Sequence, residues 1–181
     1  TTVICTDKTG TLTKNRMTLS GTWLPGNGAD QKALLHAAVL CSDATIEREG
    51  DSFITHGDPT EGAIVEGAMR EGYDPDRWRE EFLRDGLIPF ESDYQYMAVA
   101  SSGTVYVKGS PEAVLSRCAL KSEETARAEN AVHDFAEKGM RVLAVASVNL
   151  GGAALTHEAV EKGLTFTGLV AMIDPPRPEV I

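Results

Sequence analysis

Three short runs of strand-forming residues follow one another closely in the middle of the chain, and they restrict its fold more than any other feature. Residues 87–90, 94–101 and 104–108 are rich in apolar and aromatic side chains, as buried and half-buried strands are. Only Ser102 and Gly103 separate the second run from the third, and a connection this short joins antiparallel strands. We therefore predict an antiparallel sheet and an α+β class rather than a parallel, doubly wound fold.

Segments on either side extend this pattern. Further strands are expected at residues 17–24, 141–150 and 164–173, with shorter ones at 3–5 and at 52–55, the latter inside a polar loop from 42 to 57. Helices are predicted over residues 30–41, 59–70, 75–82, 111–117 and 122–138, where Asp30 and Ser122 are the expected N-caps of the first and the last. The signals are these N-caps, prolines in first turns and glycines after last turns. The expected architecture is a twisted antiparallel sheet of about six strands flanked by helices.

Composition limits the classes of function. A chain of 181 residues can bury a sizeable core as one domain with short appendages. Its net charge of −10 is the opposite of a basic nucleic-acid surface, so no nucleic-acid partner is expected. No apolar run approaches the roughly 20 residues that span a bilayer. The three cysteines lack metal-ligand spacing and are expected to be free thiols.

Residues 7–13, Asp-Lys-Thr-Gly-Thr-Leu-Thr, follow directly after an apolar run. A strand that ends at Thr6 would place Asp7 at a strand tip, next to the charge of Lys8 and to backbone N–H groups that can bind phosphate oxygens. A carboxylate needs such electrostatic support to act as a nucleophile. Thr9 stands where related phosphatases carry a second Asp as general acid/base, so a phosphate on Asp7 would not be hydrolysed rapidly by its own loop. The alternative is a structural strand and turn.

This heptapeptide resembles the phosphorylation signature of the P-type ATPases, the ion and lipid pumps that cycle through an aspartyl phosphate. The resemblance implies that Asp7 accepts the phosphoryl group, with Lys8 and Thr9 beside it in the catalytic loop. It also implies ATP as the phosphoryl donor, and Mg²⁺ bound at Asp7 and Thr9, where the ion bridges the phosphate and the Asp7 carboxylate.

Two segments resemble the adenine-binding parts of such pumps. Residues 57–63, Gly-Asp-Pro-Thr-Glu-Gly-Ala, resemble a segment of calcium-pump-like cation pumps, which implies that Glu61 accepts a hydrogen bond from the adenine amino group and that Thr60 lies near the base. Residues 89–92, Pro-Phe-Glu-Ser, resemble the strand whose Phe, here Phe90, stacks on adenine. The alternatives are a helix N-terminus with acids that complement its dipole and a core Phe at a strand end.

Two more segments resemble the remainder of that pocket. In residues 108–112, Lys-Gly-Ser-Pro-Glu, the resemblance implies that Lys108 lines the base of the pocket and that Gly109 lets the backbone approach the ligand. In residues 139–144, Gly-Met-Arg-Val-Leu-Ala, it implies that Arg141 binds phosphate through its guanidinium and that Leu143 packs by the base. A solvated lysine on a hairpin and a surface arginine are the alternatives.

One residue departs from the family pattern. Gln95 occupies a position at which many relatives carry a lysine that faces the nucleotide. Glutamine keeps the hydrogen-bonding capacity but lacks the positive charge. The affinity for the nucleotide phosphates is therefore expected to fall, or to be supplied by other residues.

The order of the motifs implies a division of the chain. Residues 174–177, Asp-Pro-Pro-Arg, resemble the hinge at which the family's chain returns to the phosphorylation domain. We expect a phosphorylation-domain stub at 1–16, a nucleotide-binding domain at 17–167 and a returning stub at 168–181. The chain would then be the ATP-binding cytoplasmic domain of a cation pump in a bacterial plasma membrane, with the phosphorylation, actuator and transmembrane domains of the same pump as its partners.

By itself the chain is expected to bind adenine nucleotides weakly and not to turn over, and the transported ion is not encoded in these residues. Two other functions remain open. One is a phosphatase or phosphotransferase of the haloacid-dehalogenase type that uses Asp7. Against it stand Thr9 and the absence of a downstream acidic loop from these residues. The other is a non-catalytic regulatory domain that has lost ATP binding, which Gln95 alone supports.

Overall fold

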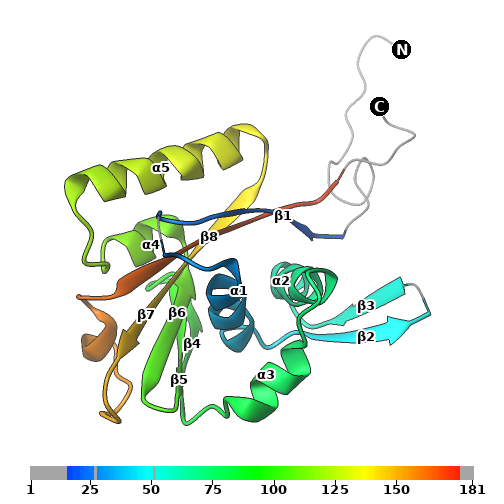
Figure 1. Ribbon diagram of the computed structural model, residues 1–181, viewed down its shortest axis with the longest axis horizontal. Coiled ribbons are helices and arrows are strands. Elements are labelled where there is room, and N and C mark those ends of the chain that lie inside the picture. The colour runs from blue at the N-terminus through cyan, green and yellow to red at the C-terminus, as the bar shows by residue number, and fades with distance from the viewer. Residues whose placement is uncertain (1–15, 27, 51, 176–181) are drawn as a thin grey trace.

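A computed structural model describes residues 16–26, 28–50 and 52–175 of the chain, and Figure 1 shows how their elements are arranged. The expected strand at 3–5 lies outside the described residues. The helices and strands follow one another in the order β1 (Thr18–Trp23), α1 (Gln31–Leu40), β2 (Thr45–Glu49), β3 (Ser52–His56), α2 (Pro59–Arg70), α3 (Pro75–Glu81), β4 (Gly86–Glu91), β5 (Tyr96–Ser101), β6 (Thr104–Gly109), α4 (Pro111–Leu115), α5 (Ser122–Glu137), β7 (Arg141–Asn149), the 3₁₀ turn η2 (Glu158–Val160) and β8 (Thr165–Ile173).

The described residues form a six-stranded sheet in the order β1-β8-β7-β6-β5-β4, in which every neighbouring pair is antiparallel. This confirms the predicted α+β class and the antiparallel sheet. The first and last strands are neighbours, and the backbone N–H of Arg16 donates to Asp174 Oδ1 at 3.1 Å. The chain therefore enters and leaves the sheet at adjacent positions (Figure 1). The boundary expected between residues 167 and 168 falls inside β8.

Two groups of helices cover the two faces of the sheet (Figure 1). Helices α1, α2 and α3 bury one apolar cluster against β7 and β8, which includes Leu34, Ile64 and Val170. Helices α4 and α5 cover the opposite face through a second cluster that includes Val107 and Leu115. Helix α1 is buried over most of its surface, as its nearly continuous apolar sequence predicts, whereas α5 buries only alanines against the sheet.

Short acidic or hydroxyl side chains begin four of the helices. Asp30, Asp58, Asp74 and Ser110 each accept a hydrogen bond from a backbone N–H in the first turn, which satisfies a donor that has no partner within the helix. The prediction that Ser122 is an N-cap is wrong. It is the first helical residue of α5, and the helix start is stabilised instead by Glu124, whose Oε2 accepts from the N–H of Lys121 at 2.9 Å.

The polar segment from 42 to 57 differs most from expectation. It contains a two-stranded antiparallel ribbon, β2 paired with β3, where the sequence predicts a loop with one short strand. Strand β2 has a single apolar residue, Ile46, among polar and charged ones, so its pattern does not distinguish it from a loop.

The strand β5 begins later than expected, because Tyr94 and Gln95 form a turn in which Gln95 has a φ of 57°.

Gly168 provides a test of the sheet geometry. Its φ is 150°, and a Cβ at this position would lie 2.5 Å from the carbonyl oxygen of Trp23 on β1. We expect Gly168→Ala to lower the free energy of unfolding in urea by about 3 kcal/mol, through backbone strain and displacement of the strand. Gly151→Ala is the matched control, since Gly151 has a φ of 59° but no atoms within 4 Å of its Cβ position; about 1 kcal/mol is expected. Equal losses in the two variants would contradict this geometry.

Candidate functional site

A cavity of about 640 Å³ opens at one edge of the sheet, beside the N-terminus of α2. The C-terminal ends of β4 and β6 and the N-terminal ends of β5 and β7 meet at this edge, because neighbouring strands are antiparallel. All eight residues predicted to contact ATP line the cavity, although they come from segments far apart in the sequence: Thr60, Glu61, Phe90, Gln95, Lys108, Gly109, Arg141 and Leu143.

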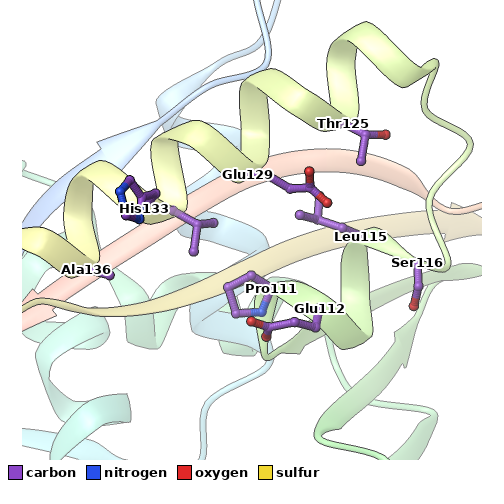
Figure 2. A pocket seen from close by; sticks show the side chains of 9 residues that line it. Pro111, Glu112, Leu115, Ser116, Thr125, Glu129, His133 and Ala136 are labelled. Carbon is purple, nitrogen blue, oxygen red and sulfur yellow. The ribbon is translucent and has the colours of Figure 1, made fainter.

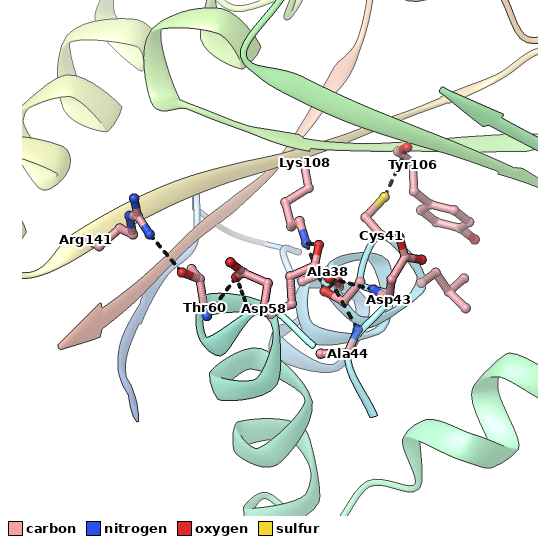
Figure 3. Close-up of polar contacts among 12 residues, drawn as sticks. Ala38, Cys41, Asp43, Ala44, Asp58, Thr60, Tyr106, Lys108 and Arg141 are labelled. Atoms are coloured by element: carbon pink, nitrogen blue, oxygen red, sulfur yellow. Dashed lines mark hydrogen bonds and ion pairs between the residues drawn. The ribbon is translucent and has the colours of Figure 1, made fainter. Parts of the chain in front are cut away.

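Lys108 and Glu61 form an ion pair at the bottom of the cavity. Lys108 is only 4% exposed, and its Nζ donates to Glu61 Oε1 at 2.9 Å and to Ser42 Oγ at 2.9 Å (Figure 3). A buried ammonium without such partners would be very costly. Of its three N–H donors, these two contacts use two, so one remains for a ligand.

The second oxygen of the Glu61 carboxylate is bound by the backbone of the loop after α1. Glu61 Oε2 accepts from the N–H of Asp43 at 2.7 Å and from that of Ala44 at 3.3 Å. Asp58, the N-cap of α2, accepts from the N–H of Glu61 at 3.1 Å and orients the helix start. The carboxylate is thus fixed from two sides. Oε2 accepts two hydrogen bonds and Oε1 accepts one, from Lys108, so Oε1 is the oxygen that keeps lone-pair capacity for a further donor.

Two polar side chains, Thr60 on α2 and Arg141 at the start of β7, meet across the cavity. Arg141 is exposed, and its Nη1 donates to Thr60 Oγ1 at 2.8 Å (Figure 3). The guanidinium has five N–H donors in a planar fork, so most of them are left for an anionic group. This pair ties the edge of the sheet to the helix that carries Glu61.

The apolar wall of the cavity includes an unusually exposed aromatic ring. Phe90 is 61% exposed, while Met97 on the adjacent strand is 3% exposed. The β4–β5 ladder shifts register between Ile88 and Glu91, so Phe90 lies in a bulge that turns it out of regular pairing. A large apolar side chain exposed in a cavity is more informative than one on a convex surface, because concave apolar sites are where flat ligands bind.

The turn from β4 to β5 packs against the end of β6. Ser110 donates from its N–H to the carbonyl oxygen of Gln95 at 2.9 Å and from its Oγ to Gln95 Oε1 at 3.2 Å. The Gln95 NH₂ group takes no part in these contacts and has two N–H donors to offer a ligand. A Cβ on Gly109 would lie 2.4 Å from the same carbonyl, so glycine is required here by the protein's own backbone.

Sequence reasoning missed Ser42, Asp43 and Ala44, which connect the end of α1 to Glu61 and Lys108. Asp43 and Ala44 act here through backbone N–H groups, which leave no pattern in the sequence. The only signal was a short polar stretch after an apolar helix.

Asp7, Lys8 and Thr9 lie outside the described residues, as do Pro176 and Arg177. Within the described residues, no group of three or more His, Cys, Asp and Glu side chains could hold a metal ion. Cys41 and Cys118 are free thiols, as predicted, and burial raises the pKa of each to about 12. No helix in the described part of the chain has the length and apolar character needed to cross a membrane.

A second cavity, of about 510 Å³, lies between α4 and α5 (Figure 2). It contains none of the predicted site residues. The ionisable side chains that line it are Glu112, Glu129 and His133, without a lysine or an arginine. Its charge therefore disfavours phosphate compounds, and the cavity at Glu61 and Lys108 is the better candidate.

The chain is similar to one known family of domains and to several longer curated proteins. Residues 30–179 match the family described as "P-type ATPase, cytoplasmic domain N". The chain is 38% identical to the cation-transporting ATPase pma1 of Synechocystis sp., over 99% of its own length and 25% of the relative. It is 38% identical to calcium-transporting ATPase 1 of Lactococcus lactis, over 99% of its own length and 23% of the relative. It is 34% identical to a probable cation-transporting ATPase F of Mycobacterium tuberculosis, over 98% of its own length and 24% of the relative. The chain thus spans about a quarter of these relatives.

The ion pair in the cavity leads to a prediction about stability. Glu61→Gln leaves the buried Lys108 ammonium facing a neutral amide, and we expect the free energy of unfolding in urea to fall by about 3 kcal/mol. Lys108→Met removes the charge itself, so its effect should be smaller, about 1–2 kcal/mol, and the double variant should lose less than the sum.

The control is Glu81→Gln, which breaks the solvent-exposed pair with Arg77 and should leave the unfolding free energy nearly unchanged. If Glu61→Gln behaved like Glu81→Gln, the ion pair would not have the structural role described here.

Proposed function

We propose that the chain, which belongs to the family of P-type ATPase cytoplasmic N domains, binds the adenine end of ATP in the cavity at Glu61, Phe90 and Lys108. The observation that carries the proposal is the convergence of all eight expected contact residues on one cavity from separate segments. An apolar wall with a few fixed polar groups is the usual composition of a small-molecule site.

The chemistry of the base fits this cavity. The exposed Phe90 ring offers a face on which a base can stack, a contact worth about 1–3 kcal/mol in nucleic-acid complexes. The Glu61 carboxylate can accept from the exocyclic amino group of adenine, whereas guanine presents a carbonyl oxygen there that the carboxylate would repel. Lys108 supplies a donor to a ring nitrogen, and Leu143 gives the base an apolar edge.

The phosphate end of the nucleotide would lie toward Arg141, Thr60 and Gln95. Arg141 is the cationic group that is not committed to a carboxylate in the contacts around the cavity, since Lys108 is paired with Glu61. Gln95 adds a neutral donor. This arrangement favours weak binding of the polyphosphate, because one guanidinium is the main charge that faces it.

In the whole pump, we propose that Asp7 accepts the γ-phosphate, with Lys8 and Thr9 in the same loop. Mg²⁺ bound at Asp7 and Thr9 would neutralise charge on the transferring phosphate. This step needs the phosphorylation domain, to which we assign residues 1–16 and 168–181 as stubs, with 17–167 as the nucleotide-binding domain. The isolated chain is therefore proposed to bind ATP without turnover.

The remaining parts of the pump are proposed from the relatives. Since the chain spans about a quarter of proteins named cation- or calcium-transporting ATPases, its partners would be the phosphorylation, actuator and transmembrane domains of one polypeptide. The domain would then lie on the cytoplasmic side of a bacterial plasma membrane. A phosphatase of the haloacid-dehalogenase type and a non-catalytic regulatory domain remain the alternatives: steady release of phosphate by the chain would favour the first, and absence of ATP binding the second.

The proposal predicts adenine-selective binding that depends on Phe90. Isothermal titration of the chain should give tighter binding of ATP than of GTP, and Phe90→Ala should weaken ATP binding about tenfold through loss of stacking. Leu87→Ala is the matched control, because Leu87 is also an exposed apolar residue of β4, 50% exposed, but does not line the cavity. No ATP binding by the parent, or equal effects of the two substitutions, would overturn the proposed site.

Gln95 leads to a second prediction. Gln95→Lys adds a positive charge to the cavity wall, so it should strengthen binding of ATP several-fold and of adenosine hardly at all, with a gain that shrinks as salt rises. Ala119→Lys, at an exposed position outside the cavity, controls for the change in net charge. A gain for adenosine equal to that for ATP would show that Gln95 does not face the phosphates.

A further inference from the structure

Two arginines outside the cavity bind the short segment 40–44 at the end of α1. Arg79, on α3, donates from Nη2 to the carbonyl oxygens of Ser42 and Ala44, both at 2.8 Å. Arg84, in the connection from α3 to β4, donates from Nη2 to the carbonyl oxygens of Leu40 at 2.7 Å and Ser42 at 3.0 Å, and its Nη1 pairs with the Asp43 carboxylate. Three alternate carbonyls are thus held by guanidinium groups.

The same segment binds Glu61 from its other side. The N–H groups of Asp43 and Ala44 donate to Glu61 Oε2. In a trans peptide the C=O and the following N–H point in opposite directions, so the unit between Ser42 and Asp43 has its oxygen on the arginines and its N–H on the carboxylate. Cations at one end and an anion at the other both align with the dipole of this peptide group, and hydrogen bonds in such a chain strengthen one another.

Partial burial of the Arg79 guanidinium costs free energy, which indicates that its contacts with the segment 40–44 have a structural role. Burial lowers the pKa of Arg79, because the guanidinium is partly withdrawn from water. The carbonyl of Leu40 belongs to the C-terminal end of α1, where the helix leaves carbonyls without internal partners and carries partial negative charge. Arg84 satisfies the Leu40 carbonyl, and the two arginines together bind the carbonyls of Ser42 and Ala44, which fixes the backbone that in turn holds Glu61.

We propose that Arg79 and Arg84 are positioning residues for nucleotide selectivity: through the peptide groups of 42–44 they hold the Glu61 carboxylate where it can accept from the adenine amino group. This inference rests on the proposed function of the cavity. Neither arginine lines the cavity, so their effect on a nucleotide is transmitted by the segment 42–44.

The test compares Arg79→Met and Arg84→Met with Arg79→Lys and Arg84→Lys in the same chain. The lysine variants keep the charge but offer no planar fork, so they should recover only part of the effect. Arg77→Met is the matched control, since Arg77 lies on the same helix, has a side chain that is 71% exposed and pairs with Glu81. Two quantities are measured: the affinities for ATP and GTP, and the hydrogen-exchange rates of the Asp43 and Ala44 amides.

The methionine variants should weaken ATP binding about tenfold and GTP binding less, so that the preference for adenine shrinks. Exchange of the Asp43 amide should rise about tenfold or more, while amides in β5 and β6 keep their rates. Arg77→Met should match the parent in both. An unchanged ratio of ATP to GTP affinity in folded variants, lysine variants included, would overturn the inference.

The two proposals fail in different ways. If the parent chain does not bind ATP, the proposed function is wrong, and hydrogen exchange of the Asp43 and Ala44 amides alone decides whether the arginines hold this segment. If these amides then exchange in the arginine variants at the rates of the parent, the positioning role is refuted as well. If the parent binds ATP selectively and the arginine variants do the same, only the positioning role is refuted.

Discussion

The buried ammonium of Lys108 is the constraint on which the site depends. It lies at the end of β6, and its paired acceptors come from the first turn of α2 and from the loop that follows α1. Because a charge at this depth must be compensated, the contacts of Lys108 restrict how the three elements can be arranged relative to one another. The ion pair therefore joins the sheet to the helical layer, and it forms the bottom of a cavity whose walls are apolar at Phe90, Met97 and Leu143 and polar at Thr60 and Arg141.

Antiparallel topology explains why one edge of the sheet collects the remaining residues. Phe90 lies one residue before the end of β4, and Gln95 immediately precedes β5. Lys108 and Gly109 end β6, and Arg141 begins β7, so successive strands bring alternate ends to the same place. Helix α2 then adds Thr60 and Glu61 from its N-terminus. The cavity needs no long loop, because its residues are held by the sheet and by a capped helix, and rigid supports of this kind favour a preorganised pocket.

Much of this could be predicted from the sequence, and the exceptions share a cause. The sheet class follows from adjacent strands with short turns, and the cavity residues were predicted because the motifs that contain Glu61, Phe90 and Lys108 resemble a known family. Strand β2, the cap at Lys121 and the roles of Asp43, Arg79 and Arg84 were missed. Each of these features depends on hydrogen bonds with backbone groups or on tertiary packing. Neither kind of contact produces a periodic pattern of side chains that could be recognised in the sequence.

We propose that the adenine ring lies in the cavity between Phe90 and the Glu61–Lys108 pair. Intermolecular nuclear Overhauser effects measured on the chain with bound ATP test it most directly, since they report protons of ligand and protein within about 5 Å and so within the ring-contact distances of a stacked pair. Our account predicts effects from the adenine protons to the Phe90 ring and to the methyl groups of Met97 and Leu143. Effects to Leu115 and Val132, which line the second cavity between α4 and α5, with none to Phe90, would contradict it.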